Sequence, residues 1–238
     1  RVMELFYEHM NNPVRVAIEP EKAVVDEVTQ ILYHVGQHEK FNLLLGLMKQ
    51  EAGEKVLIFC NTKIEAEQLE WKLNHNGFDA GQISGDLHQR ARIRVLEKFQ
   101  EGELDILIAT DVASRGLHID NITHVINYDL PQDAEDYVHR IGRTARAGNK
   151  GTAITLCCED FAQHLDRVED YLKNKIPVAW PEEELFLEER EGKPPPRKRR
   201  GPPPKSKLKK NDGRRPHDLR RPPRRRPPSR GRELARTR

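Results

Sequence analysis

Residues 55–77 have the sequence KVLIFCNTKIEAEQLEWKLNHNG, which joins a short apolar run to an amphipathic segment. Within the expected strand at 55–60, residues 56–60 are continuously apolar, as expected of a strand that is buried on both faces of a sheet. Residues 63–77 then place apolar side chains at helical spacing and end at Gly77, a residue typical of helix ends. A buried strand followed directly by a helix is the unit from which parallel α/β sheets are built.

The same alternation continues on both sides of this unit, from residue 28 to about residue 175. It predicts an α/β domain over residues 28–180, with a parallel sheet that is covered by helices on both faces. The expected strands are 28–35, 55–60, 79–84, 104–110, 123–129 and 151–158. The expected helices are 38–50, 63–77, 88–102, 133–143 and 159–175.

Charge divides the 238-residue chain into two parts. Residues 193–238 hold 20 Lys and Arg against 3 Asp and Glu, a formal charge of +17, whereas residues 1–192 hold 21 against 35, a formal charge of −14. The basic part also carries 11 of the 16 prolines. Because proline blocks helices and like charges repel, we expect a disordered Pro/Arg/Lys-rich tail over residues 181–238, with local polyproline II.

Composition also excludes several classes of protein. No apolar run approaches the roughly 20 residues that a membrane-spanning helix needs, and the residues after Arg1 do not resemble a signal peptide. Cys60, Cys157 and Cys158 are too few for a disulfide framework and lack C-x-x-C metal spacing. We therefore expect reduced thiols, no metal site in this chain, and a cytoplasmic protein.

Small polar residues follow three of the expected strands. Ligands of open α/β sheets bind outside the carboxyl ends of the strands, so these residues are candidates for a binding site. Each of them could instead cap a helix, and for any single one capping is the simpler interpretation. Several such ends on one sheet edge predict an anion-binding rim. The residues are Asn61-Thr62-Lys63, Gly85-Asp86, and Thr110-Asp111 ahead of Arg115-Gly116.

The segment HRIGRTARAG at 139–148 has an arginine at every third position. Arg140, Arg143 and Arg146 run from an expected helix into a turn, and this spacing places guanidinium groups on one flank of a helix. Two interpretations are open: the arginines pair with nearby acidic side chains, or they bind an anion such as a transferring phosphoryl group. The acidic side chains are Asp133, Glu135 and Asp136.

Three motifs in this order resemble the C-terminal RecA-like domain of the DEAD-box ATP-dependent RNA helicases. They are ATDVASRGLHI at 109–119, INYDLP at 126–131 and YVHRIGRTARAG at 137–148. The resemblance covers residues 1 to about 180, and within the family the chain is most similar to the bacterial RhlB type. It implies a RecA-like sheet, the end of a first RecA-like domain over residues 1–18, and an interdomain linker over residues 19–27.

The resemblance also implies roles for single residues. Thr62, Gly85, Arg92 and Thr110 match positions that contact the RNA sugar–phosphate backbone, which suits binding without base readout. Arg143 and Arg146 match the arginine fingers that reach the γ-phosphate of ATP. The other ATP-site and interdomain positions are Arg115, Gly116, His118, His139 and Arg140. His118 stands where the family usually has a ribose-contacting aspartate, and Ala145 where glycine is frequent.

Two motifs of a complete helicase are missing from the chain: a G-x-x-x-x-G-K-[ST] loop and Asp-Glu-Ala-Asp. The resemblance implies that these motifs and the Mg²⁺ ligands lie in an N-terminal RecA-like domain. The chain is thus expected to be the C-terminal half of an ATP-dependent RNA helicase that separates short duplexes, inactive alone. Its expected partners are ATP with Mg²⁺, RNA, its own N-terminal RecA-like domain and an RNA-degradation complex. Two alternatives stay open: a non-catalytic RNA-binding or annealing module, and a DNA helicase or translocase.

Overall fold

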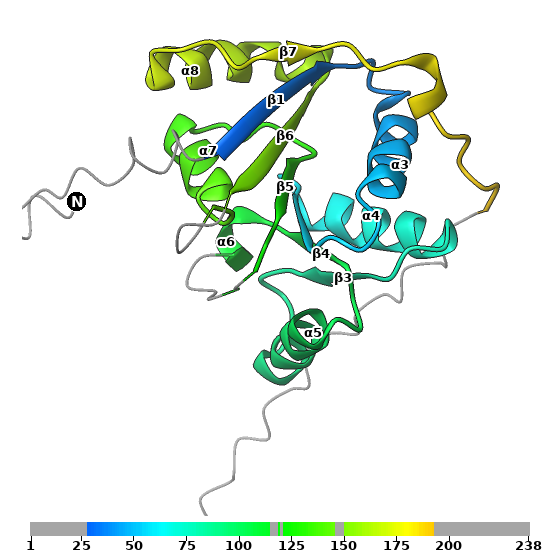
Figure 1. The fold of residues 1–238 in the computed structure, drawn as a ribbon. Helices are drawn as coiled ribbons and strands as arrows, with labels where there is room; N and C mark the ends of the chain where they lie inside the picture. Colours follow the sequence, from blue (N-terminus) through cyan, green and yellow to red (C-terminus); the bar gives the residue numbers. More distant parts are fainter. Residues whose placement is uncertain (1–27, 115–118, 120, 146–149, 193–238) are drawn as a thin grey trace, which may run out of the picture. The chain divides into compact units, whose positions relative to one another are not determined.

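The computed structural model describes residues 28–114, 119, 121–145 and 150–192, which form the fold drawn in Figure 1. A seven-stranded sheet has the order β3-β4-β2-β5-β6-β1-β7, and all its strand pairs are parallel. This confirms the RecA-like parallel α/β fold. The strands are β1 (Val28–His34), β2 (Val56–Phe59), β3 (Ala80–Ile83), β4 (Ile106–Ala109), β5 (His124–Asn127), β6 (Gly151–Cys157) and β7 (Val178–Ala179).

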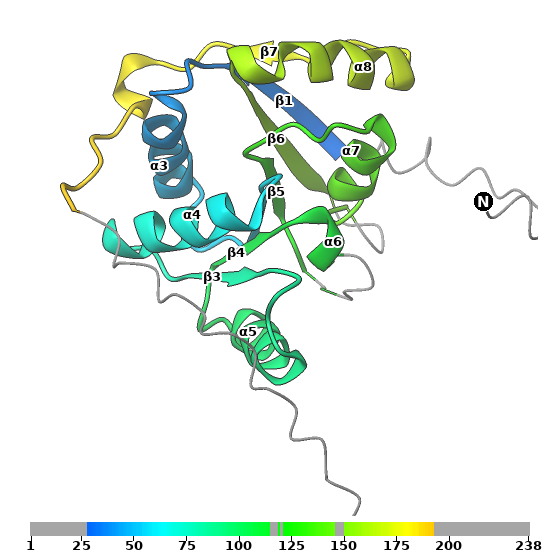
Figure 2. The same ribbon diagram turned by 180° about the vertical axis from the view of Figure 1, so that it is seen from behind.

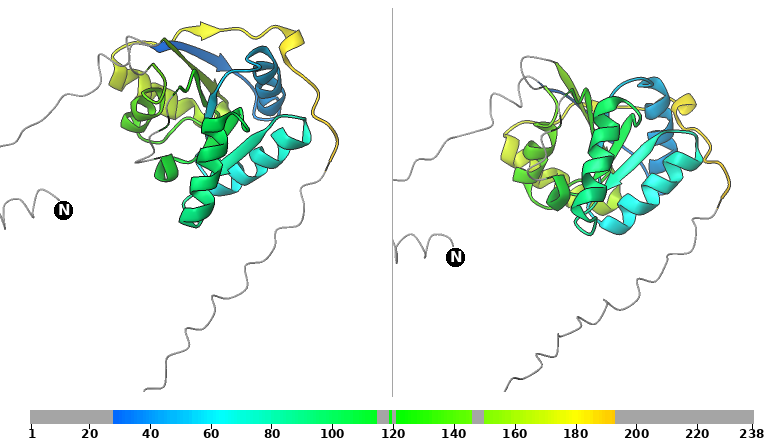
Figure 3. Two further views of the ribbon diagram at one scale, coloured as in Figure 1. Left: turned by 60° about the horizontal axis from the view of Figure 1, so that its bottom comes forward. Right: turned by 90° about the horizontal axis from the view of Figure 1, so that it is seen from below.

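Helices cover both faces of the sheet (Figure 2 and Figure 3). One face packs against α3 and α4, and the other against α5, α6, α7 and α8. The helices are α3 (Lys40–Gln50), α4 (Lys63–His75), α5 (Gln89–Glu101), α6 (Asp111–Ser114), α7 (Ala134–Ile141) and α8 (Ala162–Leu172), with 3-10 turns η1 (Glu159–Phe161) and η2 (Glu183–Leu185). None of the helices in the described part of the chain has the length and apolar character required to cross a membrane.

Strand β2 shows why the continuously apolar run at 55–60 predicted a central strand. Val56 and Ile58 pack into the core under α3 and α4, whereas Leu57 and Phe59 pack into the core on the opposite face. All four side chains are at most 1% exposed. The helix that follows ends as expected, since Gly77 lies just beyond α4 with φ of +96°.

The predicted boundary between domain and tail is wrong. Residues 181–192, here called the strap, were expected to belong to the tail, but they lie against α3 and α4 (Figure 1). Side chains of residues 185–187 pack on the core under these helices, and Leu187 N donates to Asn42 O at 3.2 Å. The apolar run at 185–187 has only three residues and is surrounded by six acidic ones, so the sequence pattern did not predict that this segment packs against the domain. The remaining tail, residues 193–238, lies outside the described residues.

Polar contacts hold the rest of the strap against α4, as far as the C-terminal end of that helix. Glu189 forms an ion pair with Lys72 at 2.8 Å, and Arg190 N donates to Asn76 Oδ1 at 2.9 Å. Both side chains of the ion pair are about one-third exposed. The apolar contacts therefore contribute most of the stabilisation, because partly exposed ion pairs are worth only about 0–1 kcal/mol.

Gly46 is the position in α3 where the strap approaches most closely. A Cβ atom on Gly46 would lie 1.8 Å from Leu185 O and 2.7 Å from its carbonyl carbon. We expect Gly46→Ala to displace the strap: overpacking costs about 1–3 kcal/mol, more than the ~1 kcal/mol that alanine gains in a helix. Limited proteolysis should then cut within residues 181–192, and the thermal midpoint should fall. A raised midpoint with the strap still protected would contradict this packing.

Candidate functional site

The carboxyl ends of β3, β4 and β2 lie side by side and carry the predicted rim. The last residues of these neighbouring strands are paired in register, so the loops that follow leave the sheet along one edge. Gly85 and Thr62 are exposed there, whereas Thr110 is 8% exposed. A Cβ atom on Gly85 would meet nothing within 4 Å, so the backbone at this point borders open space. The topology thus brings three of the four predicted RNA-contact residues to one edge.

Arg92, the fourth residue, lies in α5 and reaches toward the same edge. Its Nη2 donates to Ala113 O in α6, directly after the strand end that carries Thr110. This hydrogen bond ties α5 to the loop after β4. The Arg92 side chain is half-buried, so it both supports the edge and borders it.

Arg140 is the arginine of the 139–148 segment that lies in α7, and its side chain is 1% exposed. Nε and Nη2 donate to the two carboxylate oxygens of Asp111 at 2.6 and 2.7 Å. Nη2 also donates to Asn61 Oδ1 at 2.9 Å, and Nη1 donates to Asp129 O. The guanidinium lies 5.1 Å from the centre of the Phe59 ring. Arg140 therefore joins the ends of β4, β2 and β5, and its contacts in this structure are those of a positioning residue.

The predicted end of this helix at residue 143 is wrong. Helix α7 ends at Ile141, so Arg143 lies in the turn beyond it, where its amide donates to Arg140 O at 3.0 Å. Arg140 does pair with a carboxylate, as one interpretation required, but that carboxylate is Asp111 and not one of the acidic residues of α7.

Two contacts hold the turn that carries Arg143. Thr144 Oγ1 donates to the carbonyl oxygens of Ile122 and Thr123, at 2.7 and 3.0 Å. Ala145 then adopts a left-handed conformation with φ of +53°, which explains structurally why glycine would suit this position. Arg143 itself is half-buried, and the His139 side chain is about half exposed. Four further predicted site residues lie outside the described residues: Arg115, Gly116, His118 and Arg146.

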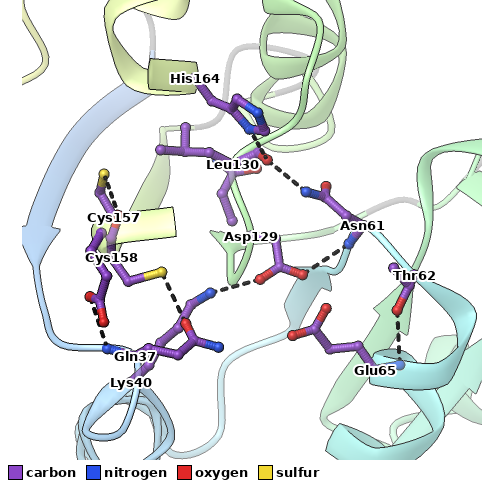
Figure 4. A network of polar contacts seen from close by, with 12 residues as sticks. Gln37, Lys40, Asn61, Thr62, Glu65, Asp129, Leu130, Cys157, Cys158 and His164 are labelled. Atoms are coloured by element: carbon purple, nitrogen blue, oxygen red, sulfur yellow. Dashed lines mark hydrogen bonds and ion pairs between the residues drawn. The ribbon is translucent and has the colours of Figure 1, made fainter. Parts of the chain in front are cut away.

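A buried ion pair beneath the rim escaped the sequence analysis (Figure 4). Lys40 Nζ lies 2.7 Å from Asp129 Oδ1, and both side chains are 0% exposed. The ammonium also lies 4.3 Å from the centre of the Tyr128 ring and 4.7 Å from that of Phe161. The other carboxylate oxygen, Asp129 Oδ2, accepts from Asn61 N at 3.0 Å. The pair therefore fixes the backbone immediately before Thr62.

Thr62 is the N-cap of α4, as its residue type allowed. Its Oγ1 accepts from Glu65 N at 3.2 Å. Burial, together with a hydrogen bond and the negative charge of nearby Asp129, raises the pKa of Glu65 to about 8. Burial likewise raises the pKa of Cys60 well above its ordinary value, and that of Cys157 to about 11. These two thiols stay protonated and unreactive at neutral pH.

The donor set at this edge suits an anion. The groups there are guanidinium, ammonium, amide and hydroxyl groups. The carboxylates of Asp86, Asp111 and Asp129 are already paired, with Lys63, Arg140 and Lys40 respectively. No cluster of three or more His, Cys, Asp or Glu side chains within the described ranges could hold a metal ion. The residues present thus fit phosphate oxygens and do not fit Mg²⁺.

Comparisons with known proteins agree with this geometry. The family model described as "Helicase conserved C-terminal domain" matches residues 39–148. The ATP-dependent RNA helicase RhlB of Shewanella sp. (strain ANA-3) is 47% identical over 189 residues, which cover 79% of this chain and 43% of that protein. The chain therefore spans about two-fifths of the length of the curated relatives it matches.

Solved structures show the same domain. The Escherichia coli DEAD-box protein SrmB, solved bound to regulator of ribonuclease activity A, is 33% identical with a TM-score of 0.64. That match covers 70% of this chain and 98% of the SrmB chain. Saccharomyces cerevisiae Dbp5, solved with RNA and ADP BeF3, is 29% identical with a TM-score of 0.67, over 75% of this chain and 48% of Dbp5.

Proposed function

The chain belongs to the DEAD-box RNA helicases, as a C-terminal RecA-like domain similar to that of RhlB, and on this premise we propose that it is one half of an ATP-driven motor that separates short RNA duplexes. The chain supplies three sets of groups. The RNA-backbone contacts are Thr62, Gly85, Arg92 and Thr110, and the arginine fingers are Arg143 and Arg146. The ATP-site and interdomain contacts are Arg115, Gly116, His118 and His139, with the buried Arg140 as the positioning residue of this site.

The observation that carries this proposal is the network around Arg140. Its guanidinium binds Asn61 and Asp111, which adjoin Thr62 and Thr110 at the strand ends, while its carbonyl oxygen accepts from the Arg143 amide. One buried residue thus supports both sites, the RNA contacts through its side chain and the turn that carries a finger through its backbone carbonyl. Such a shared framework suits an enzyme whose RNA binding and ATP hydrolysis depend on each other.

ATP is the substrate, and it binds between this domain and the N-terminal RecA-like domain. The ligands of Mg²⁺ would lie in that other domain, and the ion would supply positive charge to the transferring phosphate. When ATP and RNA bind, the two domains close and one RNA strand bends until the short duplex separates; hydrolysis reopens the cleft. Arg143 and Arg146 complete the ATP site on closure, because guanidinium groups stabilise charge on the phosphoryl oxygens.

RNA is the proposed nucleic acid, and DNA is the competing one. In a longer protein that includes the N-terminal domain, we expect RNA to stimulate ATP hydrolysis and a short RNA duplex to be separated, with DNA inactive in both assays. A 2′-hydroxyl is the group by which a protein distinguishes the two. Equal stimulation by DNA would favour a DNA translocase, and RNA annealing without ATP would favour a non-catalytic module.

A protein partner from an RNA-degradation complex is proposed on a narrower basis. SrmB, a structural relative of this domain, was solved in complex with regulator of ribonuclease activity A. That example shows that a domain of this kind presents a surface to a ribonuclease regulator. We place the action of the protein in the cytoplasm, with RNA and these partners.

The basic tail has its own prediction. Residues 193–238 carry 20 cationic side chains and should hold RNA nonspecifically, because they release counterions from the phosphates. Deleting them should weaken RNA binding and flatten the slope of log affinity against log salt by about 0.7 for each phosphate that the tail neutralises. A control tail with the same length and prolines, but with Lys and Arg replaced by Ser, should behave like the deletion. An unchanged slope would show that the tail only solubilises the chain.

A further inference from the structure

Thr62 and Glu65 have the T-x-x-E spacing of a capping box at the start of α4. Half of the box is present, since Thr62 Oγ1 accepts from Glu65 N at 3.2 Å. In a complete box the glutamate side chain also reaches back to the amide of the cap residue. Here the Glu65 carboxyl points toward Asp129 (Figure 4). Two orientations are therefore open to Glu65: one toward the buried carboxylate, the other toward the Thr62 amide.

The orientation of Glu65 toward Asp129 requires that the Glu65 carboxyl is protonated, because of the groups that already surround Asp129. Asp129 already accepts from Lys40 Nζ at 2.7 Å and from Asn61 N at 3.0 Å. A neutral Glu65 carboxyl can donate a further hydrogen bond to it, whereas an ionised one would place a second carboxylate beside a single buried ammonium. Two neighbouring carboxylates repel each other, so an ionised Glu65 must turn away from Asp129.

Two further titratable groups, Cys60 and Tyr128, lie near Glu65 and Asp129. Burial raises the pKa of the Cys60 thiol and of the Tyr128 hydroxyl, which therefore stay protonated through the neutral range. The groups that face Glu65 and Asp129 are Lys40 from α3, Cys60 after β2, Tyr128 after β5 and Arg140 from α7, with Cys158 after β6 beside Tyr128.

We propose that Glu65 is a proton-dependent positioning residue for the RNA contact at Thr62. Neutral Glu65 donates to Asp129 and leaves the rim without its charge. Ionised Glu65 releases Asp129 and turns back toward the Thr62 amide, which brings a negative charge to the edge where RNA phosphates bind. The inference rests on the proposed function, because it concerns the RNA affinity of that same site.

The sign of the effect follows from the proton balance. Burial beside Asp129 raises the pKa of Glu65 to about 8, so the carboxyl ionises as the pH rises through that value. RNA phosphates favour the neutral form, so RNA binding takes up a proton near this pH. Affinity should be highest below about pH 7 and about three- to tenfold weaker at about pH 9, since one pKa unit of differential interaction corresponds to tenfold.

The test measures the affinity of the full chain for short single-stranded RNA between about pH 7 and pH 9, in salt that suppresses nonspecific binding. Glu65→Gln keeps the size of the side chain and an N–H donor for Asp129 but cannot ionise. Glu67→Gln removes one negative charge from an exposed position of the same helix and is the control. Wild type and Glu67→Gln should lose affinity as the pH rises, whereas Glu65→Gln should keep the affinity of wild type at pH 7.

A second measurement is independent of RNA. Carbon-13 NMR of the Glu65 carboxyl should give a midpoint near 8, not the ordinary value of about 4.3. An ordinary midpoint, or a wild type whose RNA affinity is as flat with pH as that of Glu65→Gln, overturns the inference and leaves the proposed function standing. No RNA binding at any pH by all three proteins overturns the proposed function itself.

Discussion

Replacing Arg143 by alanine or by lysine is expected to lower RNA-stimulated ATP turnover by about 10³–10⁵-fold in a protein that includes the N-terminal domain. Charge builds on the transferring phosphoryl group only as its bond breaks, so a finger contributes to the transition state and little to ATP binding. Lysine keeps the charge but loses the planar fork with its two parallel donors, so it should be nearly as inactive as alanine. Turnover and the ATP concentration at half-maximal rate are the quantities to measure.

A structural role for Arg143 would give the opposite pattern. The residue lies in the turn that follows α7, held by Arg140 O, so its loss could act by disturbing that turn. In that case alanine should lower the thermal midpoint, and lysine should restore most of the turnover. Arg167 on α8, an exposed arginine that is not one of the predicted site residues, is the matched control, and Arg167→Ala should change neither quantity.

Lys40→Met should have the largest effect on stability. It removes the ammonium and leaves the Asp129 carboxylate buried without its counter-ion, which costs about 3–5 kcal/mol in the free energy of unfolding. For a domain of this size each kcal/mol lowers the thermal midpoint by about 2–4 °C. The double variant Lys40→Met, Asp129→Asn should recover much of the loss, because no charge is then left buried.

An exposed ion pair in the same domain supplies the control for Lys40. Lys63 and Asp86 lie 2.6 Å apart, close to the Lys40–Asp129 separation, but their side chains are 55% and 41% exposed. Lys63→Met should therefore cost no more than about 1 kcal/mol. Chemical denaturation of the three variants gives the comparison. Equal losses in Lys40→Met and Lys63→Met would show that burial of the first pair contributes nothing.

The sequence predicted the sheet well because its signals are local. Strand β2 is apolar on both faces and α4 carries its own cap and its terminal glycine, so neither needs information from elsewhere in the chain. Helix α6 has four residues and β7 has two, too few to show any periodicity. The strap was missed for a different reason, since its docking depends on the close approach at Gly46, which no pattern within residues 181–192 reveals.

The sequence predicted which residues lie at the edge of the sheet, but it did not predict which side chains contact each other there. Parallel strands end at one edge, so Thr62, Gly85 and Thr110 were brought together as expected. The partner of Arg140 was not predicted, because Asp111 lies 29 residues before it in the sequence. Lys40 was overlooked since its partner is 89 residues away and nothing near it in the sequence marks a buried lysine. The capping-box spacing was the one local signal that could have drawn attention to Glu65.

ATP turnover of the chain, alone and joined to an N-terminal RecA-like domain that carries the G-x-x-x-x-G-K-[ST] and Asp-Glu-Ala-Asp motifs, tests the central claim most directly. The N-terminal domain of an RhlB relative supplies that half. We predict no turnover by either half alone with or without RNA, and RNA-stimulated turnover by the joined protein that disappears in Arg143→Lys. Turnover by this chain alone, or a joined protein that binds ATP and RNA but hydrolyses ATP no faster than the N-terminal domain by itself, would contradict the account.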